Sequence, residues 1–259
     1  RPAGGGPMST PGYAGLCVVV VGGWLALYRV PFNDPARRRR TALWLAGRTG
    51  LGPEAAFAVF GTVVYLVLGA LALTALLAAT PLSLHQLVGG RPTPTMALAL
   101  LLAVLGTSSA NILCVSLLYR AVPRVDVPGE IARVQWIASI LALPRHYRWI
   151  IPAAAALFEE VLFRGAVLLG LGALGGGFGV ALAVSTCLFA AGQVALVSTP
   201  VQAYVLGTSS VTLGVVGGLL TAATGGVLPA LALHMSFAGF YTHLSASAGA
   251  RTTPRRLPL

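Results

Sequence analysis

The stretch LFEEVLFRG, residues 157–165, places two adjacent glutamates and an arginine inside an apolar run. The whole chain of 259 residues contains only six Asp and Glu residues. An ionised side chain at the centre of a bilayer costs roughly 2.5–3.5 kcal/mol on insertion scales. We therefore expect Glu159, Glu160 and Arg164 to face the inside of a helix bundle and to find partners there.

The composition around this stretch is that of a membrane protein. Hydrophobic residues make up 56% of the chain and charged residues only 9%, whereas soluble domains carry about 25% charged residues. The net charge is +11, but the arginines lie in short gaps between apolar runs. That pattern indicates membrane topology and a lipid bilayer as partner, not nucleic acid. The predicted fold class is an all-α polytopic transmembrane helix bundle.

Seven apolar segments are close to the ~20 residues that cross a bilayer, and an eighth is shorter. The eighth, 131–143, contains Arg133 and Gln135, so it could be a short span, a re-entrant segment or an interfacial helix. The sequence thus predicts seven to eight membrane segments. The seven longer ones lie at about 13–30, 54–79, 96–119, 149–170, 177–198, 203–224 and 227–244.

We expect one transmembrane domain over 13–244, after a disordered leader or expression remnant at 1–12 and before an Arg/Pro-containing tail at 245–259. The run Arg37–Arg40 follows the first segment, which predicts an outside N-terminus and a cytoplasmic Arg37–Arg40 loop. If the chain crosses the membrane seven times, Arg145 and Arg148 lie on the cytoplasmic side with the Arg37–Arg40 run. If it crosses eight times, they lie outside. The Arg-only composition suggests a bacterium with a GC-rich genome and a location in its cytoplasmic membrane.

The three charges divide into a pair and a single carboxylate. At 100° per residue Glu160 and Arg164 differ by about 40° and share a helix face, with the acid before the base. Glu159 is rotated about 140° from the arginine and points elsewhere. We interpret Glu160 with Arg164 as structural and Glu159 as a group held near a cavity for acid–base work. A purely structural charged network is the alternative.

Two more polar residues lie inside later apolar runs, Gln193 in CLFAAGQVALV and His234 in ALALHMSFAGF. Taken singly, each is typical of an interhelical hydrogen bond. Together with Glu159 they suggest a shared polar centre, because a base that activates water and two hydrogen-bond donors suffice for amide hydrolysis. A zinc site requires three or four ligands, so we expect neither metal nor cofactor.

These residues resemble the motifs of the CAAX protease and bacteriocin-processing family (CPBP or ABI), which are glutamate-dependent intramembrane proteases. The Glu-Glu-x-x-x-Arg motif is matched by Glu159, Glu160 and Arg164. The Phe-x-x-x-His motif reads Phe189 to Gln193, with Gln in place of His. In the third motif His234 is present and Ala238 replaces Asn. The resemblance covers about 149–240, the motif core.

The resemblance implies a membrane-embedded endopeptidase. Glu159 would be the catalytic base, His234 and Gln193 would bind the water or the oxyanion, and Glu160, Arg164 and Phe189 would support them. The substrate would be a peptide, a membrane protein or a small amphiphile. Two alternatives remain at this point: a scaffold or immunity protein that binds without cleavage, and an enzyme that acts on a small amphiphilic metabolite.

Overall fold

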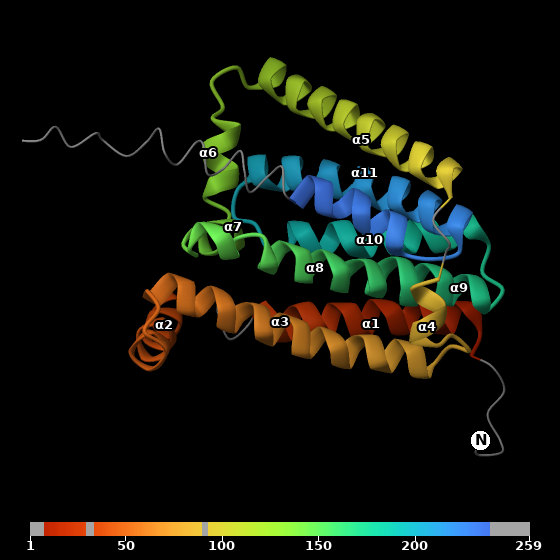
Figure 1. The fold of residues 1–259 in the computed structure, drawn as a ribbon, viewed down its shortest axis with the longest axis horizontal. Coiled ribbons are helices and arrows are strands. Elements are labelled where there is room, and N and C mark those ends of the chain that lie inside the picture. The colour runs from red at the N-terminus through yellow and green to blue at the C-terminus, as the bar shows by residue number, and fades with distance from the viewer. Residues whose placement is uncertain (1–7, 30–33, 90–92, 239–259) are drawn as a thin grey trace, which may run out of the picture.

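The computed structural model describes residues 8–29, 34–89 and 93–238, and every regular element within these ranges is a helix. Figure 1 shows them as a bundle of roughly parallel rods. The elements are α1 (Thr10–Arg29), α2 (Pro35–Thr49), α3 (Pro53–Ala78), α4 (Leu84–Leu87), α5 (Pro94–Ala121), α6 (Val127–Ala132), α7 (Gln135–Leu141), α8 (Ile150–Glu160), a π-helical segment (Val161–Leu169), α9 (Gly170–Ala173), α10 (Phe178–Val194), α11 (Pro200–Thr224) and a last helix, Leu228–Ala238.

Four helices in the described ranges, α1, α3, α5 and α11, are long and apolar enough to cross a membrane. Two shorter apolar helices are α10 and Leu228–Ala238. The helix from Ile150 to Ala173 is continuous, but its middle is π-helical. The all-α membrane fold is therefore confirmed, whereas the count of seven to eight spans stays a prediction.

Sequence signals explain where the long helices begin and end. Pro94 and Pro200 occupy first-turn positions, where a missing N–H is tolerated. Before them Thr93 and Thr199 accept hydrogen bonds from the third helical N–H of each helix. At the other end of α11, Gly225 takes the left-handed conformation with φ of 71°.

The segment 131–143 does not form a single helix. Its residues fall into the end of α6 and the whole of α7, which are six and seven residues long. Helices of this length rise only about 10 Å, so neither piece crosses a bilayer. Ile131 and Ile137 pack instead against Val205 of α11.

The structure differs from the predicted boundaries in two further places. The Arg37–Arg40 run was expected in a loop, but it lies in α2, where Asp34 caps the N-terminus and only Ala42 is buried. Helix α1 begins at Thr10, three residues before the expected start of the domain. The leader residues 1–7 and the tail 245–259 lie outside the described residues.

The continuous helix 150–173 lies at the centre of the bundle. On one side it packs against α3 and on the other against α10, while α1 pairs with α3 and α11 pairs with α10. Helix α5 packs on α11 and is otherwise the most exposed of the long helices. The main core joins Tyr13 and Trp24 of α1, Phe163 and Phe189.

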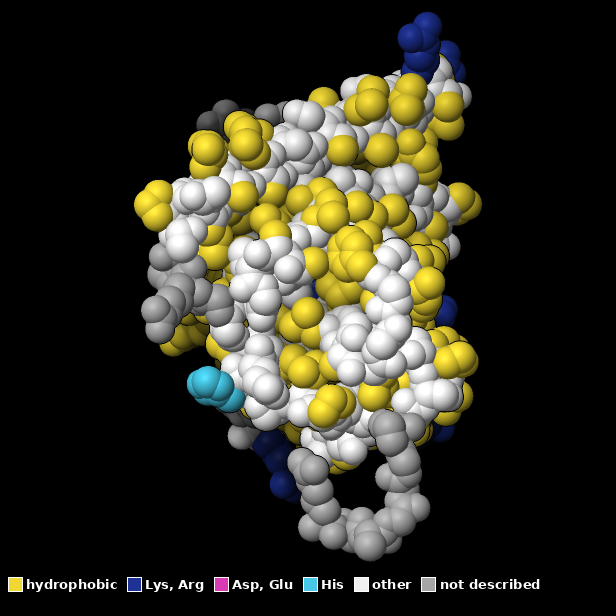
Figure 2. Space-filling view, turned by 90° about the vertical axis from the view of Figure 1, so that its right-hand side faces the viewer, with side chains coloured by type: hydrophobic (Ala, Val, Ile, Leu, Met, Phe, Trp, Pro, Cys, Tyr) yellow, Lys and Arg dark blue, Asp and Glu magenta, His cyan; other side chains and the backbone are white. Residues whose placement is uncertain are grey.

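The two ends of the bundle differ in charge. At the end formed by α2, α7 and the start of α8, five arginines border one cavity: Arg29, Arg38, Arg39, Arg145 and Arg148. The opposite end carries α4 and α9, and its visible surface in Figure 2 is mostly apolar or uncharged. Arginines of α2 and of the stretch before α8 thus lie at the same end of the bundle.

Candidate active site

The helix that carries the charged motif changes its winding there. Glu159 and Glu160 end α8, and Arg164 lies on the π-helical segment that follows. Two carbonyl oxygens of this segment accept side-chain hydrogen bonds from neighbouring helices, that of Phe163 from Ser185 at 2.7 Å and that of Ala166 from Tyr13 at 2.8 Å. Isolated π-helical turns are frequent at functional sites.

Glu160, Arg164 and His234 form the buried part of the site. The carboxylate Oε2 of Glu160 lies 3.2 Å from Nε of Arg164, and both side chains are 1% exposed. Its other oxygen, Oε1, lies 2.8 Å from Nδ1 of His234. A carboxylate only accepts hydrogen bonds, so Nδ1 carries the proton in this contact. Glu160 thereby fixes the tautomer of His234 and leaves Nε2 on the side of Glu159, 3.8 Å from its Oε2.

Phe189 and a glycine shape the pocket around Arg164. The guanidinium carbon of Arg164 lies 4.3 Å from the ring centroid of Phe189, a cation–π contact that is favourable where water is excluded. The same ring packs edge-on against His234. Gly217 also lies next to this side chain, since a Cβ there would be in van der Waals contact with Nε of Arg164 at 3.4 Å. Phe189 therefore joins the arginine to the histidine.

Glu159 is held by three side chains from three other helices. Its Oε1 accepts a hydrogen bond from the hydroxyl of Tyr65 at 2.6 Å and one from the amide Nε2 of Gln193 at 3.3 Å. Its Oε2 lies 3.8 Å from Nε2 of His234. A carboxylate oxygen has two lone pairs, and those of Oε1 are both engaged. Oε2 is thus the oxygen left to act on another molecule.

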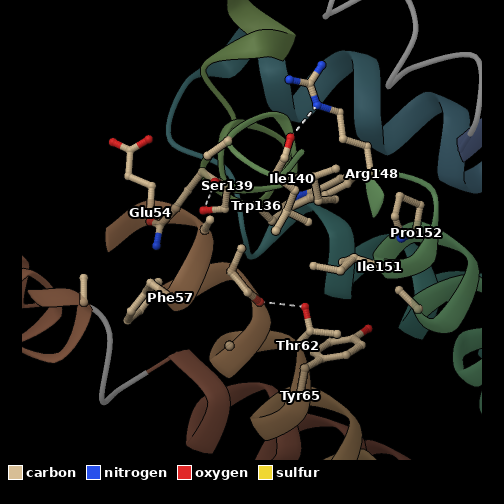
Figure 3. A pocket seen from close by; sticks show the side chains of 18 of the residues that line it. Glu54, Phe57, Thr62, Tyr65, Trp136, Ser139, Ile140, Arg148, Ile151 and Pro152 are labelled. Carbon is tan, nitrogen blue, oxygen red and sulfur yellow. Dashed lines mark hydrogen bonds between the residues drawn. The ribbon is translucent and has the colours of Figure 1, made fainter. Parts of the chain in front are cut away.

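The site opens into a cavity of about 1400 Å³. Glu159, Gln193, His234 and Tyr65 line it, and so does Ala238, whereas Glu160 and Arg164 do not. The cavity continues between α3 on one side and α7 and α8 on the other (Figure 3). Small-molecule pockets usually enclose about 300–1,000 Å³, so this one has room for a segment of peptide.

The structure brings together all the residues predicted for the site. Glu159, Gln193 and His234 meet at one place, Glu160 contacts Arg164, and Phe189 packs beside them. Their catalytic roles stay predictions. The geometry also refines the expected role of Gln193: its amide already donates to Glu159, so only its second N–H is left for an oxyanion.

Sequence reasoning missed Tyr65. Its ring is buried among Trp24, Tyr28 and Phe158, at centroid distances of 4.8–5.9 Å, and its hydroxyl reaches Glu159. The one signal in the sequence is a phenol inside the apolar segment 54–79, where a buried hydroxyl must find a hydrogen-bond partner. That signal does not say which partner it finds.

In the described residues, no group of three or more His, Cys, Asp or Glu side chains could hold a metal ion. The side chains of Tyr65 and Gln193 both donate hydrogen bonds to Oε1 of Glu159. The donor set around Glu159 therefore suits a carboxylate that acts on water or on a carbonyl group.

The fold and the site together define a helical, multi-pass membrane protein with a buried glutamate centre that opens into a large cavity. Comparison with known proteins agrees with this class: residues 144–240 match the family model described as Type II CAAX prenyl endopeptidase Rce1-like. The match confirms, for this part of the chain, the resemblance to the CPBP family. No curated protein and no solved structure matched the chain.

Proposed function

We propose that the protein is an intramembrane endopeptidase in which Glu159 is the general base. The observation that carries the proposal is the asymmetry of its carboxylate. Oε1 is held by Tyr65 and Gln193, while Oε2 lies 3.8 Å from Nε2 of His234, and both Glu159 and His234 line the cavity. The Rce1-like match of residues 144–240 supports the class of reaction, and the cavity supports a peptide or membrane-protein substrate.

The proposed first step is the activation of water. A water molecule that hydrogen-bonds to Oε2 of Glu159 can also reach Nε2 of His234, because the 3.8 Å between these atoms is too long for a direct hydrogen bond. Glu159 takes one proton as the water oxygen attacks the scissile carbonyl carbon. The products of this step are a protonated Glu159 and a tetrahedral intermediate with one negative oxygen.

The second step breaks the C–N bond. The second amide N–H of Gln193 is a donor for the oxyanion. Collapse of the intermediate restores a carbonyl and expels the amine, which receives the proton held by Glu159. His234 remains oriented throughout by Glu160, whose charge is balanced by Arg164. The net reaction consumes one water and one peptide bond, and the carboxylate is regenerated.

A second candidate, binding without cleavage, is favoured by Gln193 and Ala238. These residues replace the His and Asn of the family motifs, and Gln cannot exchange a proton as His can. A protein of this kind would hold a peptide or partner protein in the same cavity. A third reading keeps the chemistry of Glu159 but applies it to a small amphiphile.

Glu159→Gln separates these candidates, because it keeps the shape of the side chain and removes the base. Membranes with equal amounts of wild type, Glu159→Gln and Glu54→Gln are compared by mass spectrometry of peptides and small metabolites. Glu54 is the matched control: it lines the same cavity but is exposed. We expect cleavage to fall by about 10²–10⁴ in Glu159→Gln and by less than about twofold in Glu54→Gln.

Each outcome selects one candidate. A peptide product that disappears only in Glu159→Gln supports the endopeptidase. A small molecule that changes without any peptide would support the third reading. Equal profiles in all three samples, with the proteins equally folded, would overturn the proposed base and leave binding without cleavage.

A further inference from the structure

The outer part of the cavity is basic. The described lining of the whole cavity contains five arginines and two glutamates. One of the two glutamates, Glu159, lies deep in the cavity and not at its opening. The other, Glu54, is exposed and lies on the α3 side of the opening (Figure 3). A cleft lined by charges of one sign concentrates ligands of the opposite sign. The opening therefore favours an anionic group.

Two of these arginines are held in place. The guanidinium of Arg38 stacks over the ring of Phe57, with 5.0 Å between its carbon and the centroid. Arg148 donates its Nε hydrogen to the carbonyl oxygen of Leu143 at 2.9 Å (Figure 3). Both side chains are half-buried. Among the described residues, neither forms an ion pair with an acidic side chain, and the terminal N–H groups of a guanidinium suit a contact with a carboxylate.

The helices set the spacing between this basic opening and the proposed catalytic group. Arg148 precedes the start of α8 by two residues, and from that start at Ile150 to Glu159 the helix advances nine residues, about 14 Å at the helical rise of 1.5 Å per residue. From Phe57, under Arg38, to Tyr65 it advances eight residues, about 12 Å. An extended peptide covers roughly 3.3 Å per residue. The two sites are therefore about four or five peptide residues apart.

We propose that the protein takes acidic peptide segments, with a carboxylate held at the basic opening by Arg38 or Arg148 while an amide four or five residues away lies at Glu159. The inference rests on the proposed function for its reference point, the scissile bond. It adds a substrate class and a position within the substrate. Phe57 and Trp136, which line the same stretch of cavity, suit the apolar residues between the two points (Figure 3).

Binding is tested separately from cleavage. The full-length Glu159→Gln protein in phosphatidylcholine vesicles is mixed with a pool of apolar twelve-residue peptides that each contain one Asp, or with the same pool carrying Asn. Retained peptides are quantified by mass spectrometry. We expect about tenfold better retention of the Asp pool, because its carboxylate forms charged hydrogen bonds with the arginines and the amide of Asn does not. The preference should fall below twofold in Arg38→Gln/Arg148→Gln.

The matched control is Arg120→Gln/Arg124→Gln, which removes two exposed arginines that do not line the cavity. This protein should keep the full preference for Asp. Equal retention of both pools, or loss of the preference in the control as well, would overturn the proposal.

A phosphate headgroup of a lipid is the competing occupant of the arginine site. Vesicles that contain phosphatidylglycerol test this occupant. If this lipid abolishes the preference for the Asp pool, and if the amount of lipid retained by the protein depends on Arg38 and Arg148, the site is a lipid site and the proposal fails.

Cleavage of the same peptide pools by the wild-type protein distinguishes the acidic-peptide site from the proposed endopeptidase activity. Products of the Asp pool should place the acidic residue four or five positions from the cut. An arginine-dependent Asp preference without any cleavage would uphold the acidic-peptide site and count against the endopeptidase. Cleavage with no preferred position for Asp would uphold the endopeptidase and overturn the spacing.

Discussion

The region 144–240 and the helices before it contribute differently to the same site. The later region matches a known family and supplies the two glutamates, Arg164, Gln193 and His234. The earlier helices lie outside that match, yet α3 supplies Tyr65 and one wall of the cavity. The comparison teaches that the motif residues and part of the cavity wall come from different parts of the chain. Motifs mark the first, whereas only packing reveals the second.

The largest expected effect is on stability, and it lies in the matched region. Arg164→Met leaves the carboxylate of Glu160 buried with only His234 beside it. Removing one member of a buried ion pair typically lowers the free energy of unfolding by about 3–5 kcal/mol. We expect a loss of that order, measured by unfolding of the purified protein in mixed micelles.

Arg133→Met is the matched control from the earlier region. Arg133, the residue directly after α6, also pairs with a nearby glutamate, Glu130, at 2.8 Å, but its side chain is 65% exposed. Exposed pairs contribute at most about 1 kcal/mol, so this change should have a small effect. Equal losses from the two substitutions would show that burial does not distinguish the two arginines, and the structural role of Arg164 would fail.

The next effect is on catalysis, and it arises outside the matched region. Tyr65→Phe removes one of the two donors to Oε1 of Glu159. A hydrogen bond to a charged group contributes about 1.5–3 kcal/mol, so kcat should fall roughly tenfold to a hundredfold. KM should stay within about twofold, because Tyr65 orients the base and does not hold the substrate.

Tyr13→Phe supplies the comparison for Tyr65. Tyr13 is also a buried phenol on an early helix, but its hydroxyl donates to the carbonyl of Ala166 and not to Glu159. We expect about 1 kcal/mol lower stability and an unchanged kcat. If Tyr65→Phe lowered the stability and left kcat unchanged, as expected for Tyr13→Phe, Tyr65 would be a packing residue. The earlier helices would then contribute only a wall of the cavity.

The site was predictable where polar residues interrupt apolar helices. Gln193 and His234 stand out for that reason, and a helical spacing of four residues was enough to pair Glu160 with Arg164. Tyr65 was not predictable, because an aromatic residue in the apolar segment 54–79 does not interrupt its pattern. The π-helical winding after Glu160 was hidden as well, since the residue pattern there is that of an ordinary apolar helix, and the side chain that donates to its Phe163 carbonyl, Ser185, is distant in sequence.

The fold was predictable to a similar degree. Long apolar runs gave α3, α5 and α11 to within a few residues, because a span of 20 or more apolar residues has few alternatives. Segment 131–143 was harder, since a length of 13 residues does not decide between one helix and two. Helix α2 was missed because its arginines suggested a loop, although a charged helix can lie at a surface with little of it buried.

The smallest expected effect is a gain, and it tests the variant residue of the matched region. Gln193 lies on the cavity, 3.3 Å from Oε1 of Glu159. In Gln193→His an imidazole at this place could exchange a proton with the intermediate, which an amide cannot do. We expect the cleavage rate to rise, by up to about tenfold, without a change in stability.

The same cleavage rate is measured in parallel on Tyr65→Phe and on the double variant Tyr65→Phe/Gln193→His. If the gain persists when Tyr65 is replaced, the histidine acts on the substrate and Tyr65 orients Glu159 independently. If Gln193→His instead lowers the rate, the amide N–H groups are needed at this place, and the gain expected from a proton-exchanging histidine is wrong.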